Sequence, residues 1–215
     1  MSSFLDYLSS NYDDLLVQAA EHVQLVAIAI VAGTVVGVLL GIVAHRSSLL
    51  APAILNTESV LLTIPSLALF ALLIPLVGIG PTPAIIALFL YSLLPITRNT
   101  VAGLAQVDAA VVESARGMGM GWARRLVRIE LPLAWPVILT GIRVATLLTI
   151  GIAAVAALVG GPGLGQEIFS GIRRLGSSGA DQPIWGGTLL IVLIAFAFDV
   201  VYLVIGRLTT SKGLR

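Results

Sequence analysis

The residues whose types and spacing could do chemistry gather in one polar segment, Glu113–Pro132, near the middle of an otherwise apolar chain. The segment reads ESARGMGMGWARRLVRIELP and carries four arginines, Arg116, Arg124, Arg125 and Arg128. Such a segment cannot lie in hydrocarbon, because charged side chains there are costly. We expect a loop that faces water and binds a partner or a surface.

Catalysis by the chain itself is not expected. A nucleotide-binding P-loop needs a lysine directly after glycine, whereas the single lysine, Lys212, follows Ser211. The chain has no cysteine, which excludes a disulfide, a thiolate metal site and a cysteine nucleophile. His22 and His45 flank the first apolar run from opposite sides, so we expect interfacial residues and no metal pair. We therefore predict no catalytic residue, no metal and no cofactor in this chain, and a partner that drives any work.

Composition indicates an integral membrane protein. The chain has 215 residues, of which 58% are hydrophobic and 11% charged, against about 25% charged in soluble domains. The apolar runs leave no room for a separate soluble core, so we expect one membrane domain. The N-terminus lacks a basic region, so we expect no cleavable signal peptide.

Five apolar runs predict an all-α fold of about five transmembrane helices. A bilayer core of ~30 Å needs about 20 apolar residues in a helix. The runs that meet or approach this length are Val23–Ala44, Ser59–Ile79, Thr82–Ile96, Leu133–Val159 and Thr188–Leu208.

Basic residues predict the orientation, because they concentrate on the cytoplasmic side. With the N-terminus outside, the outer segments hold only Arg173 and Arg174 among the loop arginines, and the outer N-terminal tail is acidic. We expect an extracytoplasmic segment at 1–22, with Tyr7–Glu21 as a short amphipathic helix or an unstructured tail. A transmembrane domain follows at 23–208, and 209–215 form a cytoplasmic tail that carries Lys212 and Arg215.

Two short helices are expected within the polar segment. Asp108 is a plausible N-cap for a helix from Ala109 to about Arg116. Three glycines, Gly117, Gly119 and Gly121, should end it because glycine tolerates positive φ. A second helix, Trp122–Ile129, should end at Leu131-Pro132, where the next span begins. Such a helix docks into a groove on a soluble partner or binds anionic lipid headgroups.

The spacing of this segment resembles the loop by which ATP-binding-cassette importer permeases engage their ATPase. That pattern is Glu-Ala-Ala, three residues, Gly, nine residues, Ile, one residue, Leu-Pro. The residues at the corresponding positions are Glu113, Ser114, Ala115, Gly119, Ile129, Leu131 and Pro132. Ser114 in place of the first alanine is the one departure. The resemblance implies a coupling loop at about 99–132, with ATPase contacts from Glu113, Ser114, Ala115, Arg116, Gly117, Met118, Gly119, Leu131 and Pro132.

Further segments resemble the permeases of glycine betaine, carnitine and choline importers. They are Thr63–Ala68, Tyr91–Thr100, Gly141–Arg143 and Gly163–Gly165. The resemblance implies a type I importer fold in a prokaryotic plasma membrane. It also implies an ATPase dimer that holds ATP and Mg²⁺, a separate extracytoplasmic binding protein, and a second permease, either the same chain or a related one.

Charges and breaks within the spans are candidates for the translocation path. Arg143 and Asp199 lie at similar depth, ~12 Å from the cytoplasmic ends of antiparallel helices, so they form an ion pair or find separate polar partners. Proline frees backbone carbonyls that a path can use, and the candidates here are Pro65, with Ser66, and Pro95. Tyr91 could contact a quaternary ammonium by cation–π attraction. Packing kinks and packed aromatic side chains are the alternatives.

We predict a permease subunit for a compatible solute such as glycine betaine, carnitine or choline. A permease for methionine or another amino acid is the nearer alternative, and a membrane scaffold that transports nothing is the more distant one.

Overall fold

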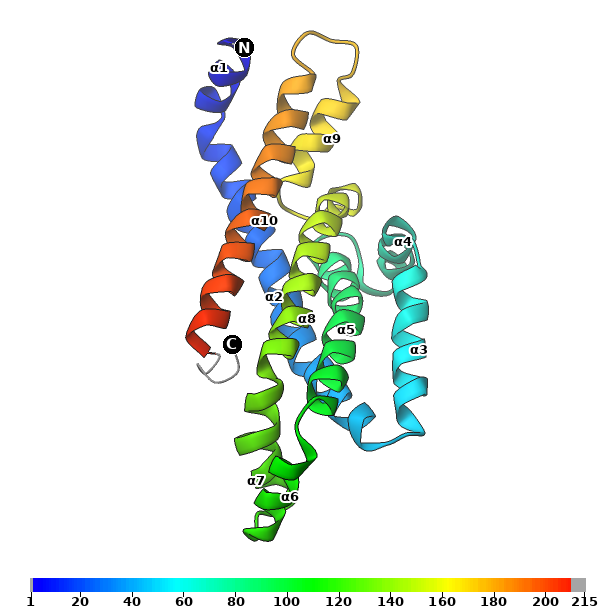
Figure 1. Cartoon of the computed structure of the whole chain (residues 1–215). Coiled ribbons are helices and arrows are strands. Elements are labelled where there is room, and N and C mark those ends of the chain that lie inside the picture. Colours follow the sequence, from blue (N-terminus) through cyan, green and yellow to red (C-terminus); the bar gives the residue numbers. More distant parts are fainter. Residues whose placement is uncertain (1, 210–215) are drawn as a thin grey trace.

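The computed structural model describes residues 2–209, and every regular element in that range is helical (Figure 1). The predicted tail thus lies almost wholly outside the described residues. The elements in chain order are α1 Ser2–Ser10, α2 Tyr12–Arg46, α3 Leu50–Thr63, α4 Ser66–Val77, α5 Pro81–Ala105, α6 Ala109–Gly117, α7 Trp122–Arg125, a π turn Leu126–Glu130, α8 Leu131–Ala153, a 3₁₀ turn Ala154–Val159, α9 Gly165–Arg173 and α10 Asp181–Thr209.

The described residues contain four helices that are long and apolar enough to cross a membrane, and the pair α3–α4 is a fifth span if counted as one. This agrees with the expected five. The second run differs from the prediction, because α3 begins at Leu50 and the pair bends by 98°. Ser59–Ile79 is therefore not one straight span.

The bend lies at Ile64 and Pro65. Residues before proline disfavour the helical conformation, and Ile64 accordingly adopts extended backbone angles, φ −65° and ψ 126°. The Tyr91 hydroxyl of α5 donates to the Ile64 carbonyl at 2.7 Å. This bond replaces one that the broken helix has lost, so a side chain from another helix stabilises the break.

Close packing of α2 against α5 forms the centre of the molecule. Gly33, Gly37 and Gly41 lie one above another on α2 and face Ser92, Ile96 and Thr100 of α5. An added Cβ at Gly33 would lie 1.9 Å from the Ser92 hydroxyl, and one at Gly41 would lie 2.5 Å from Thr100 Cβ. Small residues at this spacing let membrane helices approach closely.

The outer end is built from α1, the start of α2, α9 and the start of α10 (Figure 1). Tyr7 and Gln18 both donate to the Glu167 carboxylate of α9, the second at 2.9 Å. Burial raises the pKa of the Tyr7 phenol, and the hydrogen bond to Glu167 raises it further to a smaller extent. The segment predicted as a separate amphipathic helix is thus the end of α1 and the first turns of the long helix α2, and no helix boundary marks residue 22.

His22 is fully buried, with its Nε2 atom 3.1 Å from the Ile150 carbonyl of α8. The expectation that His22 is an interfacial residue is therefore wrong. The reason is that α2 begins at Tyr12, ten positions earlier, so His22 lies inside the helix packing rather than at its edge.

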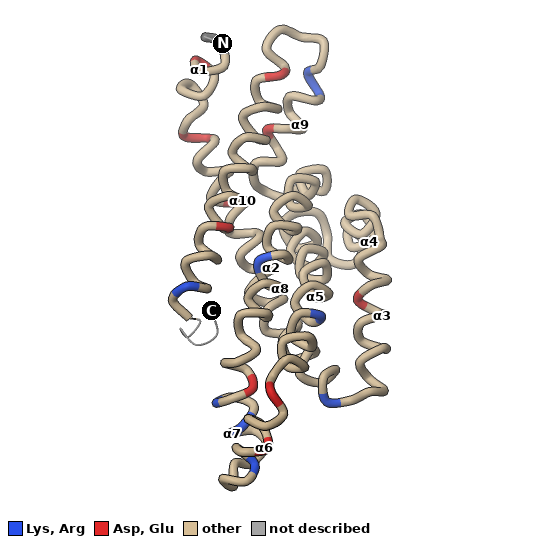
Figure 2. The backbone as a smooth tube through the Cα atoms, in the orientation of Figure 1, with Lys and Arg blue, Asp and Glu red and all other residues tan. Residues whose placement is uncertain are grey.

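Figure 2 shows basic residues gathered around α6 and α7, at the end of the molecule opposite α1 and α9. The orientation was predicted from this concentration of basic residues at one end of the chain's spans.

Candidate functional site

The loop that is predicted to couple to an ATPase places α6 at the tip of the molecule (Figure 1), and local capping fixes both ends of this helix. The Asp108 carboxylate accepts from the Ala110 amide at 2.8 Å, as predicted for an N-cap. At the other end the Met120 amide bonds to the Ala115 carbonyl and the Gly119 amide to the Arg116 carbonyl. This is the pattern of a Schellman motif. Gly119 takes φ +78°, whereas Gly117 is the last helical residue and Gly121 has φ −62°.

Seven of the nine residues predicted to contact an ATPase lie on α6 or directly after it, and most of these seven are exposed. Ala115 is buried, and the exposed ones are Glu113, Ser114, Arg116, Gly117, Met118 and Gly119. The Ser114 hydroxyl donates to the Ala110 carbonyl at 2.8 Å, so this departure from Glu-Ala-Ala is satisfied within the helix. A side chain at Gly119 would meet nothing within 4 Å in this chain. The tip is therefore a free surface with room for a partner.

Leu131 and Pro132 do not end a helix, which corrects the prediction. The chain is helical without a break from Trp122 to Val159. Pro132 lacks an amide donor, and it falls directly after a π turn at Leu126–Glu130, where the Leu131 amide bonds back five residues to the Leu126 carbonyl. The wider π turn thus lets the helix continue through the proline. The loop is thus joined rigidly to a span.

Glu130 forms the electrostatic centre of the junction between the loop and the spans. Its Oε1 accepts from Arg125 Nε at 2.8 Å, and its Oε2 pairs with Arg46 Nη2 at the end of α2. The Glu130 and Arg125 side chains are only 5% and 8% exposed. The Arg46 guanidinium also lies over the Trp122 ring, 5.6 Å from its centroid. These contacts tie α2, α7 and α8 together.

A cavity of about 410 Å³ adjoins this cluster, between α6 and the inner ends of α2 and α5. Glu113 and Arg116 of α6 line it together with Arg46, Arg125 and Glu130. Glu113 therefore faces the arginines of its own chain across this space. Charged side chains of the exposed helix and of the ion-pair cluster thus line one cavity.

Five of the six residues predicted for the translocation path fall into two groups. Pro65 and Ser66 lie at the break between α3 and α4, and Tyr91 contacts the same break through Ile64. Tyr91 is only 2% exposed, so its ring is packed in the core. Arg143 of α8 pairs with Asp199 of α10 at 2.6 Å. Figure 1 shows α3 and α4 on the opposite side of α5 and α8 from α10.

Pro95, the sixth residue, belongs to neither group and is packed against α8. Its carbonyl accepts from the Asn99 amide at 2.8 Å, and it packs so closely on α8 that a Cβ at Gly141 would lie 2.7 Å from it. The role of these residues in a path stays a prediction, whereas the Arg143–Asp199 ion pair is a feature of the structure.

Two buried carboxylates were missed from the sequence. Glu58 of α3 is 4% exposed and accepts from the Thr97 hydroxyl at 2.8 Å. Glu58 directly precedes the predicted span Ser59–Ile79, so the pattern of apolar runs does not mark it as an intramembrane charge. Glu130 lay inside the loop motif, where its neighbours are exposed arginines. Within the described residues no group of three or more His, Asp or Glu side chains could hold a metal ion.

Comparison with known proteins places this architecture in a family. Residues 33–211 match the binding-protein-dependent transport system inner membrane component. The chain is 40% identical over 218 residues to a glycine betaine/carnitine/choline transport system permease protein of Bacillus subtilis, covering 100% of this chain and 97% of that protein. It is 41% identical over 217 residues to an osmoprotectant import permease protein of Salmonella typhimurium, covering 98% of this chain and 99% of that protein.

Solved structures share the fold. A chain of the MetNI methionine ABC transporter, in an inward-facing conformation, superposes with a TM-score of 0.81 at 20% identity, covering 92% of this chain and 96% of that chain. A chain of an amino acid ABC transporter crystallised with histidines gives 0.74 at 19% identity, covering 95% and 97%. The protein is thus a multi-pass inner-membrane permease subunit and not itself an enzyme, and it belongs to the family of binding-protein-dependent transport system inner membrane components.

Proposed function

We propose that this chain moves a quaternary ammonium osmoprotectant, such as glycine betaine, carnitine or choline, into the cytoplasm. The observation that carries the proposal is similarity along the whole chain, at about 40% identity, to permeases whose names specify these solutes. The similarity to methionine and amino acid transporters lies near 20% identity and concerns the fold alone. Methionine is therefore the weaker candidate.

The exposed tip of the coupling loop is proposed as the surface that receives the force of ATP hydrolysis. ATP and Mg²⁺ would be bound by an ATPase partner. The support is geometric, because α6 is capped at both ends and exposed, and Glu130 ties Arg125 of the same loop to Arg46 of α2. Movement of an ATPase groove against the loop would pass to the spans through this cluster. A scaffold that transports nothing has no need of such a link.

We further propose that two permease subunits form the translocation path between them. Family membership implies an ATPase and an extracytoplasmic binding protein, and the second permease is either a copy of this chain or a related one. The support is that the candidate path residues are split between two sides of this single chain, so a path would be completed by another subunit. Pro65, Ser66 and the Arg143–Asp199 pair remain the candidates from this chain.

The test is uptake by the assembled transporter in proteoliposomes. The full chain is reconstituted with its ATPase and binding protein, and entry of labelled glycine betaine, carnitine, choline and methionine is measured with ATP inside. We expect ATP-dependent entry of at least one quaternary amine and none of methionine. Entry of methionine alone would contradict the solute assignment but leave the permease assignment standing.

A further inference from the structure

Glu58 is a buried carboxylate of α3, and only one of its two oxygens has a partner. The residue is 4% exposed. Its Oε1 accepts from the Thr97 hydroxyl of α5 at 2.8 Å, whereas Oε2 is buried and has no hydrogen-bond partner among the described residues. None of the ion pairs within that range includes Glu58. An ionisable side chain inside a membrane span marks a functional site whose partner has to be identified.

A pocket with a volume of about 340 Å³ lies beside this carboxylate, between α2, α3 and α5. Besides Glu58, its lining consists of Leu40, Ala53, Ile54, Thr57, Leu61 and Leu93. The Thr57 hydroxyl donates to the Ala53 carbonyl at 2.8 Å, within its own helix. Both of these residues are exposed, so the pocket opens at the surface of the chain. The described lining therefore holds one charged group, Glu58, among walls that are mainly apolar.

This combination of one carboxylate and apolar walls restricts the chemistry of a ligand. A metal ion needs several oxygen ligands, and the described residues contain no group of three or more His, Asp or Glu side chains that could hold one. A primary ammonium brings three N–H donors, for which the pocket offers too few acceptors. A quaternary ammonium has no donor to satisfy. Its charge is covered by methyl groups, which pack against apolar walls while the carboxylate balances the charge.

The pocket also lies where a solute on its way to the cytoplasm would pass. Glu58 is eight positions after Leu50, the first residue of α3, which is roughly 12 Å at 1.5 Å per residue. Leu61 lies one turn before Pro65, at the break that is predicted to belong to the translocation path. The pocket thus continues that group of path candidates towards the cytoplasmic end of α3.

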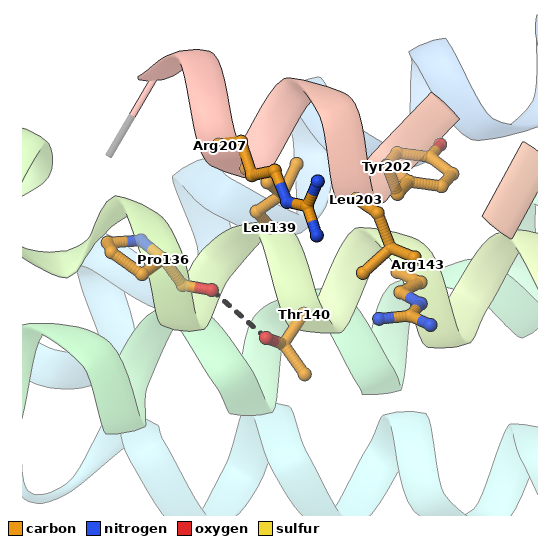
Figure 3. A pocket seen from close by; sticks show the side chains of 8 residues that line it. Pro136, Leu139, Thr140, Arg143, Tyr202, Leu203 and Arg207 are labelled. Atoms are coloured by element: carbon orange, nitrogen blue, oxygen red, sulfur yellow. Dashed lines mark hydrogen bonds between the residues drawn. The ribbon is translucent and has the colours of Figure 1, made fainter. Parts of the chain in front are cut away.

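The second group of path candidates offers no comparable site. Arg143 is bound to Asp199 at 2.6 Å. Figure 3 shows the pocket beside Arg143, in which the Thr140 hydroxyl donates to the Pro136 carbonyl at 3.0 Å. These polar groups already have partners, whereas Glu58 Oε2 does not.

We propose that Glu58 is the residue of this chain that binds the quaternary ammonium group of the transported solute. The methyl groups lie against Leu40, Leu61 and Leu93, and the carboxylate holds the positive charge. Thr97 fixes the carboxylate through Oε1 and leaves Oε2 directed to the ligand. The proposal rests on the proposed function, since it assigns a binding residue to the same solute.

Saturation-transfer NMR on the full-length chain in a maltoside detergent tests the site without the binding protein. The probes are choline and 3,3-dimethylbutan-1-ol, which has the same shape without the charge. We expect the chain to bind choline more tightly than the uncharged alcohol. Glu58→Gln should weaken choline binding about fivefold, the scale of one partly desolvated charge pair, and leave binding of the alcohol unchanged.

Two further variants separate the charge from the pocket. Glu167→Gln is the matched control, because Glu167 also accepts from a hydroxyl, that of Tyr7, but lies outside the pocket. It should bind choline as the wild type does. Ala53→Phe should fold, because Ala53 is exposed, and its ring should fill the pocket. It should abolish binding of both probes while Glu58 stays in place, and it carries the test if Glu58→Gln does not fold.

Equal affinity of the wild-type chain for choline and the alcohol would overturn the proposal. Displacement of choline by an equal concentration of Na⁺, or equal choline binding by Glu58→Gln and the wild type, would do the same. ATP-driven choline uptake at a saturating concentration of binding protein then separates this proposal from the proposed function. Absence of uptake of every quaternary amine by the wild-type transporter would contradict the function. Uptake of choline by the wild type and at the same rate by Glu58→Gln would contradict only the role of Glu58.

Discussion

The Arg46 guanidinium at the end of α2 pairs with the Glu130 carboxylate at the start of α8, across 84 positions of the chain. The same carboxylate holds Arg125 through its other oxygen. One buried acid thus joins the first span, the coupling loop and the fourth span. Because both oxygens are used, the cluster specifies the position of the loop and not only its charge.

Glu130→Gln should uncouple and destabilise the protein. The amide keeps the size of the side chain but leaves two arginines without their counter-charge, and removal of one partner from a buried pair costs about 3 kcal/mol or more. We expect a lower apparent melting temperature in detergent and loss of most ATP-driven uptake. Asp14→Asn, an exposed acid on the same long helix α2, is the control and should change neither quantity.

Retention of the wild-type melting temperature by Glu130→Gln would show that the ion pairs contribute no stability. Normal uptake in the same variant would show that the cluster does not transmit movement from the loop.

Local signals in the sequence were enough to predict the number of spans and the bounds of α6. The Asp108 cap, the stop at Gly119 and the apolar runs each depend on residues within a few positions of one another. The size of the bend at Pro65 could not be predicted in this way, because Tyr91 stabilises it from a different helix. The Arg46–Glu130 pair likewise joins residues 84 positions apart, so no local pattern could predict it.

The sequence pattern does contain the signal for one packing feature. Gly33, Gly37 and Gly41 recur every four residues, which marks a face of α2 that packs closely on another membrane helix. The identity of that helix, α5, could not follow from the spacing, since many spans could supply the facing side chains.

Arg143 and Asp199 should behave as partners in a double-mutant cycle. Arg143→Gln or Asp199→Asn alone leaves an uncompensated charge in the membrane, so each should lower the apparent melting temperature. The double variant removes both charges and should be more stable than the worse single variant. The effects of Asp199→Asn and Asp14→Asn, which lie far apart, should instead add. A double variant no better than the worse single one would rule out the pairing.

Tyr91→Phe should loosen the break between α3 and α4. The substitution removes only the hydroxyl that bonds to Ile64, and a buried carbonyl without its partner costs about 1–3 kcal/mol. We expect a lower melting temperature and faster hydrogen exchange around Ile64. Tyr12→Phe is the control, because Tyr12 is 60% exposed. If both variants melt together with the wild type, the hydroxyl does not stabilise the break.

The orientation can be tested directly, because the chain has no cysteine. Arg124→Cys and Arg173→Cys place single thiols at opposite ends of the molecule. In intact cells a membrane-impermeant maleimide should label position 173 and should reach position 124 only after permeabilisation. Labelling of position 124 from outside would reverse the predicted topology.

Gly119 offers the sharpest test of the coupling loop. Two effects of a side chain can be separated there, the backbone cost at positive φ and the steric clash with a docked ATPase. Its φ of +78° disfavours any side chain, whereas the surrounding space is open within this chain. Gly119→Ala should therefore show only the backbone cost, about 1 kcal/mol, and keep most uptake. Gly119→Trp adds bulk where the ATPase is expected to dock. It should insert normally but lose ATPase association and ATP-driven uptake.

The control variant Gly151→Trp distinguishes loss of ATPase docking from general destabilisation of the protein. Gly151 of α8 is exposed, has no positive φ and has nothing within 4 Å of an added Cβ, so Gly151→Trp should retain ATPase binding. Co-purification of the ATPase and uptake of labelled solute are measured for all three variants, together with the affinity of the binding protein, which should not change. The double variant Gly119→Trp, Glu113→Lys should bind no ATPase, since bulk and reversed charge act on the same exposed helix. Normal uptake by that double variant would mean that α6 does not transmit the work of ATP hydrolysis, and the proposed mechanism would lose its principal support.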